Sequence, residues 1–283
     1  MPISPQELIA NLGDLPPLPQ VAAQVLRLAA DPDSSTDDLQ KVIITDQALT
    51  AQILKIANSA MFGMMREVKT LSQAIMTLGF ATIKSVVIAS SAKNLYSRGA
   101  AGLAERLMWE HALVAAIGAR TIARSLRYNR AEEAFLAGLM HDIGKSVLGM
   151  KFPDRYGQIV GSVYNGEIQD GLHAELEVFG FDHAMVGEAL MRSWNLAHSL
   201  EEAVRWHHEP ADADEEFRPL AAIVALGNRI ALEEKVGVGS PESIDLSTRQ
   251  ALEILKVDED RLADLREAAL QAIEVDKATI REL

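Results

Sequence analysis

Apolar residues recur at helical spacing along almost the whole chain, and this periodicity is the strongest constraint on its fold. Residues three or four positions apart share one face of an α-helix, whereas a half-buried strand requires strict alternation. The β-branched run Val86–Ile88 is compatible with a strand, but helical spacing on both sides favours a helix there. We therefore predict an all-α protein of two packed helical bundles. The predicted helices span about 19–30, 47–59, 80–96, 103–126, 131–149, 154–163, 169–178, 182–193, 198–208, 217–233, 247–255 and 258–274, with two more capped by Thr36 and Thr70.

The charge balance limits the classes of molecule that this chain is expected to bind. The chain has 40 acidic and 27 basic side chains, and its net charge of −13 repels phosphate backbones and anionic lipid. We therefore expect neither broad nucleic-acid binding nor a membrane partner. The chain contains no cysteine, which excludes disulfides and thiolate metal sites and suits a cytoplasmic protein. No apolar run approaches the ~18 residues of a membrane-spanning helix.

Two segments rich in glycine and small polar residues divide the chain. Residues 97–102 read Ser-Arg-Gly-Ala-Ala-Gly, and residues 236–243 read Val-Gly-Val-Gly-Ser-Pro-Glu-Ser. Such compositions favour loops over regular helix, so both segments are predicted to be joints. We expect an N-terminal bundle over 1–100, a second bundle over 101–235 and a helical extension over 236–283.

Five of the seven histidines, together with one aspartate and one asparagine, fall on helix faces that should be buried. A buried imidazole or carboxylate is costly unless it is paired or bound to a metal. Each of them taken alone could be a core residue bonded to a backbone carbonyl. If the helix faces meet, however, imidazoles and a carboxylate converge, and these are ligands of first-row transition metals. The residues are His111, His141, Asp142, His183, His207, His208 and Asn228.

The placement of these residues gives further expectations. Asp142 follows His141 within one predicted helix and is therefore rotated by about 100° from it. His207 and His208 are predicted on the last turn of another helix. The two histidines expected to lie at the surface, outside any site, are His173 and His198.

The polar residues occur in a recognisable order: a His, a His-Asp pair, a His, a His-His pair and a polar residue within a helix. That order, and the string His141-Asp142-Ile143-Gly144-Lys145, resemble the HD superfamily of metal-dependent phosphohydrolases, especially its cyclic-di-GMP phosphodiesterase branch. The resemblance implies that the second bundle is HD-like. Further stretches that match the spacing of that branch are Glu177-Val-Phe-Gly-Phe-Asp-His183, Gly187, Trp194-Asn-Leu196 and His207-His208-Glu209.

The N-terminal half carries a second set of motifs. They are Leu15-Pro-Pro-Leu-Pro19, Asp46-Gln-Ala-Leu-Thr50, Ala57-Asn-Ser-Ala60 with Phe62-Gly63, and Ala74-Ile-Met-Thr-Leu-Gly79. In combination these motifs resemble the HDOD domain, the HD-related output domain of bacterial signalling. The resemblance covers about residues 12–235 and implies a role in signal transduction.

The resemblance also implies a ligand set. In the active HD enzymes the first His, the His-Asp pair and a late Asp hold one metal, and the Asp of the pair bridges to a second. His111, His141 and Asp142 match the first group, with Asn228 at the position of the late Asp. Lys145 matches the lysine that meets a substrate phosphate. The second group is complete and consists of Asp142, His183, His207 and His208.

Three departures from the family pattern weaken the implied activity. Asn228 offers a neutral amide oxygen, which is a weaker ligand than a carboxylate, so one metal site is favoured over two. Leu107 stands where the branch has a Glu for a third metal. The Gly-Tyr-Pro motif that the branch carries soon afterwards is missing, because the chain reads His207-His-Glu-Pro-Ala-Asp-Ala-Asp214. These differences argue against specific cyclic-di-GMP hydrolysis.

Three functions therefore stay open. The favoured one is a non-catalytic regulatory HDOD domain whose partner is a signalling protein or a small phosphorylated ligand. The alternative is a metal-dependent phosphohydrolase of a nucleotide or phosphoester, in which Asp142 and Lys145 serve catalysis. The third is a helical core whose histidines bind no metal. A metal, if bound, is expected to be Fe, Mn, Ni or Zn, which suit imidazole-rich sites better than Mg or Ca does.

The N-terminal motifs have two interpretations of their own. Asn58 and Ser59 could simply end a helix, and Leu15–Pro19 could simply be a rigid entry to the first helix. Alternatively, the surface of the first bundle, or the cleft between the two bundles, receives a partner or ligand.

Overall fold

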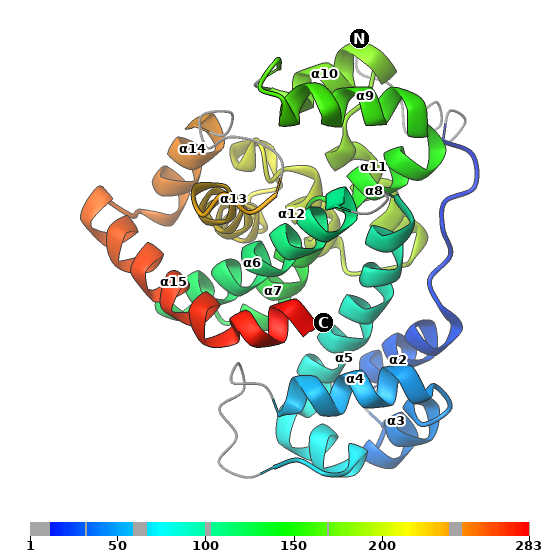
Figure 1. Cartoon of the computed structure of the whole chain (residues 1–283). Helices are drawn as coiled ribbons and strands as arrows, with labels where there is room; N and C mark the ends of the chain where they lie inside the picture. Colours follow the sequence, from blue (N-terminus) through cyan, green and yellow to red (C-terminus); the bar gives the residue numbers. More distant parts are fainter. Residues whose placement is uncertain are drawn as a thin grey trace.

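The structure, a computed structural model, describes residues 12–31, 33–58, 67–99, 103–168, 170–237 and 245–282. Within these ranges every regular element is a helix, which confirms the predicted all-α class (Figure 1). The helices are α2 (Gln20–Ala30), α3 (Thr36–Ile43), α4 (Gln47–Ala57), α5 (Leu71–Gly99), α6 (Leu103–Ser125), α7 (Ala131–Met140), α8 (Ile143–Lys151), α9 (Pro153–Tyr164), α10 (Gly171–Phe179), α11 (His183–Ser193), α12 (His198–Arg205), the 3-10 helix η2 (Pro210–Asp212), α13 (Arg218–Glu233), α14 (Asp245–Leu255) and α15 (Glu259–Glu282).

Some sequence predictions fall outside these ranges. Residues 59–66, which include the Ser59 and Phe62-Gly63 parts of one motif, are not described. The same holds for part of the predicted joint at 97–102 and for most of the predicted loop at 236–243. The division into bundles at 1–100, 101–235 and 236–283 stays a prediction.

The helices α2, α3, α4 and the first part of α5 form the N-terminal bundle, drawn in blue to cyan in Figure 1. Their amphipathic spacing buries Leu39, Ile43 and Ile53 completely. Ser35, and not Thr36 as predicted, caps α3, because its side chain accepts from the Asp38 backbone N–H in a capping box. The bundle therefore follows the expected pattern with one cap displaced by a residue.

The long helix α5 connects the N-terminal bundle to the rest of the molecule, since it packs against α2, α3 and α4 and also against α6, α7 and α8. Gly79 breaks it with a φ of 75° and a ψ of 167°, where the sequence predicted one helix to stop and the next to begin. The segment Leu71–Tyr96 is long and apolar enough to cross a membrane by length and composition alone, with a mean hydropathy of 1.5. Its apolar side is largely buried within the protein, as in the core helix of a helical bundle.

Glycines allow the central helices to approach closely. A Cβ at Gly227 of α13 would lie 2.6 Å from the Ala115 carbonyl oxygen of α6, and one at Gly138 of α7 would lie 2.9 Å from the Ala116 Cα. Helices α6, α7 and α13 consequently pack backbone against backbone. A Cβ at Gly144 of α8 would likewise meet the backbone carbonyl at the start of α11. These approaches bring the helix faces that carry the histidines together.

Two predicted helices end earlier than the sequence suggested. The predicted helix 131–149 is divided into α7 and α8, because Asp142 adopts φ −100° and ψ 6° at the junction. The predicted helix 198–208 ends at Arg205, so His207 and His208 lie in the turn that follows. The expected 100° rotation between His141 and Asp142 is therefore wrong, since the chain turns between the two residues.

An extended strap of residues 13–19 runs along one side of the molecule into α2 (Figure 1). Its Asp14 carbonyl accepts from Lys151 Nζ at the end of α8, at 2.6 Å, and its Pro16 carbonyl accepts from Trp194 Nε1 at the end of α11, at 2.8 Å. Pro19 occupies the N-cap position of α2, which agrees with a rigid entry to that helix.

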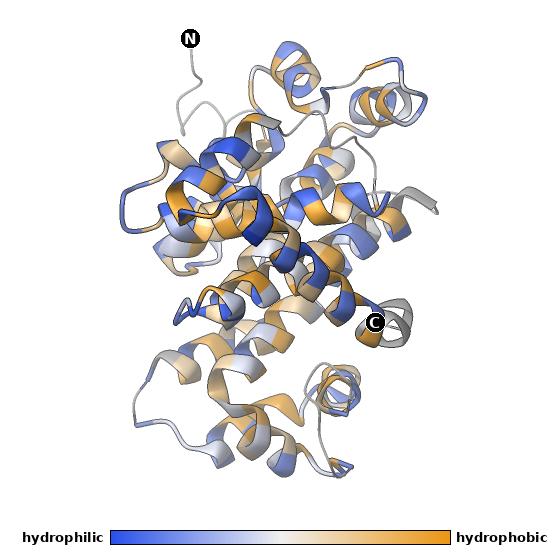
Figure 2. Ribbon diagram, turned by 90° about the vertical axis from the view of Figure 1, so that its left-hand side faces the viewer, coloured by the Kyte–Doolittle hydropathy of each residue, from blue (hydrophilic) through white to orange (hydrophobic). Residues whose placement is uncertain are grey.

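The C-terminal helices cover the opposite side. Helix α14 packs against α13, and α15 packs along α6 (Figure 1). Figure 2 shows hydrophilic and hydrophobic residues side by side along the outer helices, as expected of helices that bury only one face. Helix α15 continues to Glu282, beyond the predicted end at 274.

Candidate metal centre

Asp142 lies between two groups of imidazoles. Its Oδ2 is 3.5 Å from His111 Nε2 and 3.4 Å from His141 Nε2. Its Oδ1 is 3.2 Å from His183 Nε2 and 4.0 Å from His207 Nε2. The two oxygens of one carboxylate therefore face two sets of nitrogens, an arrangement suited to bridging two cations.

The second set of nitrogens is completed by His208, whose Nε2 is 3.1 Å from His183 Nε2. Within the group His183, His207 and His208, and within the group His111, His141 and Asp142, the ligand atoms all lie within 4.8 Å of one another. We call these six residues the imidazole–carboxylate cluster. All of them are buried except His208, which is half-buried.

The outer ring nitrogens of the cluster are occupied by acceptors. The Nδ1 of His111 is 2.8 Å from the Val236 carbonyl oxygen. His141 Nδ1 is 2.7 Å from the Gly138 carbonyl oxygen, and His207 Nδ1 is 2.8 Å from that of Val204. Because a carbonyl only accepts, each Nδ1 carries the proton, and the lone pair of each neutral ring is on the Nε2 that faces Asp142.

The local fold explains why two of the rings point inward. Gly138 and Val204 belong to the last turns of α7 and α12, where carbonyls lack a partner within the helix. His141 and His207 each donate to the carbonyl three residues earlier and so satisfy these helix ends. The early termination of both helices thus orients the rings toward the cluster.

Burial keeps most of these imidazoles neutral. It lowers the pKa of His141 to about 4, and it also lowers the pKa of His111, His207 and His208. The Nε2 atoms of His111 and His141 lie 3.3 Å apart, so two lone pairs face each other. A cation between them would relieve this repulsion, and neutral imidazole is the form that binds metal.

His183 has a different environment. Its Nδ1 and its backbone N–H both donate to Glu175 Oε2, each at 2.7 Å. Burial opposes a charge on the ring, but the Glu175 carboxylate and Asp142 raise the pKa of His183 to about 9. A proton on Nε2 thus fills, between His183 and Asp142, the position that a metal ion would take.

Asp142 stays ionised although it is buried. Burial alone would raise its pKa, but neighbouring His141 and the ammonium of Lys145 hold that pKa well below its usual range. Lys145 Nζ lies 2.8 Å from Asp142 Oδ2 and is partly exposed. The carboxylate is therefore available as an anionic ligand.

Unsatisfied polar atoms test whether the cluster fits a metal. Among the residues that the structure describes, His207 Nε2 and Asn228 Oδ1 are buried and make no hydrogen bond. Buried polar atoms without partners are rare in folded proteins and indicate a missing water, ion or ligand. The donor set of imidazoles and one carboxylate suits a first-row transition metal. The residues present therefore fit the transition-metal ion that the sequence analysis suggested.

The structure therefore brings together all seven residues that the sequence placed at a site, with Asn228 at one edge of the cavity described below. Their role as ligands stays a prediction. His173 and His198 lie apart and are exposed, as expected. His198 does lie near Glu202 and Asp214, and its pKa is raised by its hydrogen bond to Glu201.

Glu175 was not identified from the sequence as part of the site. Glu175 is 2% exposed, whereas Leu176 and Val178 on the same helix are 39% and 44% exposed. This inverted pattern on α10 is the signal that could have identified it, because a charge on the inner face needs a buried partner. Tyr156 of α9 is a second missed residue; it is buried, and burial together with the nearby charge of Glu175 raises the pKa of its hydroxyl well above the usual value.

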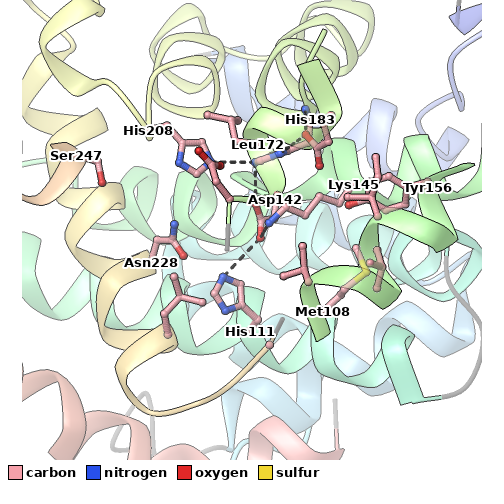
Figure 3. A pocket seen from close by; sticks show the side chains of 18 of the residues that line it. Met108, His111, Asp142, Lys145, Tyr156, Leu172, His183, His208, Asn228 and Ser247 are labelled. Atoms are coloured by element: carbon pink, nitrogen blue, oxygen red, sulfur yellow. Dashed lines mark hydrogen bonds and ion pairs between the residues drawn. The ribbon is translucent and has the colours of Figure 1, made fainter. Parts of the chain in front are cut away.

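His111, Asp142, His183 and His208 of the cluster line a cavity of about 340 Å³. Figure 3 shows His111, Asp142, His183 and His208 around its centre, with Lys145 extending toward Tyr156 and with Asn228 and Ser247 on the opposite side. Helices α9, α10, α13 and α14 contribute the remaining walls. A small ligand in the cavity would reach the cluster directly.

Comparison with known proteins agrees with this architecture. The model of the HDOD domain matches residues 15–210, and the chain belongs to the HDOD family. The crystal structure of an HDOD domain protein of unknown function from Geobacter sulfurreducens has the same fold. It has a TM-score of 0.79 and 23% identity over 98% of this chain and 95% of that chain.

Two other relatives extend the comparison. A candidate phosphohydrolase from Shewanella amazonensis has a TM-score of 0.73 and 28% identity, over 95% of this chain and 97% of that chain. A curated relative, an uncharacterized protein of Treponema pallidum (strain Nichols), is 27% identical over 230 residues, which is 77% of this chain. The chain spans only 42% of the length of that relative.

Proposed function

We propose that this chain is a regulatory HDOD domain of a signalling pathway that binds a transition metal and, beside it, a small phosphorylated ligand. One observation carries the proposal. The two oxygens of Asp142 face two sets of imidazole nitrogens, and three of the five rings direct a lone pair inward because their outer nitrogens donate to backbone carbonyls. A metal bound there would supply positive charge for a phosphate group.

The two halves of the cluster are unequal as ligand sets. His183, His207 and His208 provide three imidazoles beside Asp142, and Glu175 adds negative charge behind His183. The other half has two imidazoles and the neutral oxygen of Asn228. Because a carboxylate behind a histidine makes the ring a stronger ligand, we propose that the first equivalent of metal binds at His183, His207 and His208.

A second candidate function is a metal-dependent phosphohydrolase. It is favoured by Lys145, whose ammonium lies 2.8 Å from Asp142 Oδ2 and lines the cavity. In that position Lys145 would hold a phosphoryl oxygen and neutralise charge that develops during ester cleavage. The structural relative from Shewanella amazonensis is a candidate phosphohydrolase, which makes this activity worth testing.

One pair of assays separates the two functions. The full chain, reconstituted with Mn²⁺, is titrated with methylphosphonate and is separately incubated with 4-nitrophenyl phosphate. Metal-dependent binding without turnover supports the regulatory function. Turnover that is lost in Lys145→Gln, but kept in the surface control Lys41→Gln of α3, supports the enzyme. Absence of both binding and turnover would contradict the proposal.

A further inference from the structure

The cavity above the imidazole–carboxylate cluster is lined by two unlike kinds of residue. Four residues of the cluster and Lys145 are polar or charged, whereas many other lining residues are apolar, among them Met108 and Leu172, which Figure 3 shows on two sides of the cluster. The other lining residues include partly buried and buried aliphatic side chains of α9 together with apolar residues of α6, α10 and α13. These residues are Met108, Ile159, Val160, Val163, Leu172 and Leu232.

The apolar surface is not required by the metal site. A bound ion needs its ligands and the groups that orient them, and the cluster and the carbonyls behind its rings already supply these. Val160, Val163 and Leu172 remain partly accessible to solvent although they are aliphatic. Apolar surface that faces a cavity, next to a few convergent polar groups, is the usual composition of a pocket for an organic ligand.

The charges of the cavity restrict how many anionic groups such a ligand can carry. Among the lining residues that the structure describes, Lys145 is the single lysine or arginine. Asp170 and Glu209 also line the cavity and are solvent-exposed, which places their carboxylates where the cavity meets solvent. A metal-loaded cluster would attract one phosphate, but a second anionic group near the opening would meet carboxylates and no compensating cation.

We propose that the cavity selects a phosphomonoester with one phosphate and a compact apolar or planar body, and that it discriminates against ligands with a second phosphate. The phosphate would lie at the metal and Lys145, and the body would lie against Val160 and the neighbouring apolar residues of α9 that line the cavity. This inference rests on the proposed function, because it names the class of ligand for the same site.

Three phosphonates test the inference, because their carbon–phosphorus bonds resist hydrolysis. Methylphosphonate carries the anion alone, benzylphosphonate adds a planar apolar body, and p-xylylenediphosphonate adds a second anion at the far end of that body. Each is titrated calorimetrically into the Mn²⁺-loaded full chain. Benzylphosphonate is expected to bind at least about tenfold more tightly than methylphosphonate, and the diphosphonate about tenfold more weakly than benzylphosphonate.

Two sets of variants test which lining residues cause the preference for an apolar body and the discrimination against a second anionic group. Val160→Ser should reduce the preference for benzylphosphonate over methylphosphonate about fivefold and leave methylphosphonate unchanged. Val178→Ser changes an exposed valine of α10 that does not line the cavity, and it should have no effect. The double variant Asp170→Asn, Glu209→Gln should restore the affinity for the diphosphonate, and asparagine preserves the N-cap that Asp170 provides to α10.

The outcomes separate this inference from the proposed function. If none of the phosphonates binds the metal-loaded protein, the proposed function itself is wrong. If methylphosphonate and benzylphosphonate bind equally well, or if the diphosphonate binds most tightly, the metal site stands and the inferred ligand class is wrong. An effect of Val178→Ser equal to that of Val160→Ser would also contradict the inference.

Discussion

The N-terminal bundle and the half of the molecule around the imidazole–carboxylate cluster fold by the same rules but differ in what they bury. In the described part of the N-terminal bundle and of α5, the buried polar side chains are hydroxyls, and Ser85 and Ser91 each donate to a carbonyl of their own helix. The other half buries four imidazoles, the amide of Asn228, the guanidinium of Arg120, and the carboxylates of Asp142, Glu175, Asp182 and Glu201.

This difference indicates which half of the molecule carries the function. An apolar interior is sufficient for a helical bundle, and α2, α3 and α4 pack without any buried charge. Buried ionisable groups oppose folding unless they are paired, so a cluster of them that leaves some atoms unsatisfied needs a ligand to be explained. The same comparison predicts that destabilising substitutions in the two regions have different effects on metal binding.

The largest effects are expected from one substitution in each region. Gly144→Ala would place a Cβ 1.9 Å from the His183 carbonyl oxygen and force α8 away from α11. Leu39→Ala would leave a cavity in the N-terminal bundle. Each should lower the free energy of unfolding by about 3 kcal/mol. Only Gly144→Ala should also abolish metal binding, because it separates Asp142 from His183.

Denaturant unfolding and metal titration of the two variants check this prediction. Gly157→Ala is the control for the glycine substitution, because nothing lies within 4 Å of a Cβ at that position of α9. It should raise stability slightly and leave metal binding unchanged. Equal loss of metal in Leu39→Ala would mean that the cluster depends on global stability and not on the α8–α11 contact.

A smaller effect is expected at Glu175. In Glu175→Gln an amide oxygen can still accept from His183 Nδ1, but the negative charge behind the ring is lost. The affinity for metal should fall by about 10- to 100-fold. The metal-free protein should also lose stability at neutral pH, because the buried ion pair between His183 and Glu175 is lost. Competition with a chromogenic chelator measures the affinity. Glu177→Gln, on the exposed side of the same helix, should behave like the unmodified chain.

The smallest effect concerns pH. Burial lowers the pKa of His141 to about 4 in the folded chain, whereas an unperturbed histidine has a pKa of about 6.5. Between pH 6.5 and pH 4 the unfolded chain therefore binds a proton at His141 that the folded chain does not. The stability contributed by neutral His141 is present above pH 6.5 and is lost as the pH falls through this window. Between pH 6.5 and 5.5 the part of this loss that His141 contributes should be about 1 kcal/mol for the metal-free protein.

The variant His141→Gln isolates this contribution. His183 acts in the opposite sense, because its pKa is raised to about 9 and its contribution is lost as the pH rises from 6.5 through 9. Unfolding curves in chelator at three pH values would therefore show less acid sensitivity in His141→Gln. An unchanged pH dependence would mean that His141 is not held neutral by burial.

Much of the fold could be predicted from the sequence, because helical spacing and caps are local signals. The stop at Gly79 and the helical state of Val86–Ile88 follow from them. The convergence of the histidines was expected from the order of motifs, although periodicity alone could not show that the helix faces meet. The glycine contacts between α6, α7 and α13 are what make them meet.

The missed details have a common cause, which is that tertiary contacts override local pattern. The helix predicted over 131–149 is broken at Asp142, and the helix predicted to 208 ends at Arg205. In both cases a histidine side chain occupies a carbonyl that another helical turn would have used. Glu175 was missed for a similar reason, since its partner lies in the next helix along the chain.

The most direct test of the account is the metal content of the full chain, purified without an affinity tag and measured by elemental analysis. The account predicts one equivalent or more of Fe, Mn, Ni or Zn, lost in both His208→Ala and Asp142→Ala. Less than about a tenth of an equivalent, unchanged after reconstitution, would contradict it and leave the histidines as core residues.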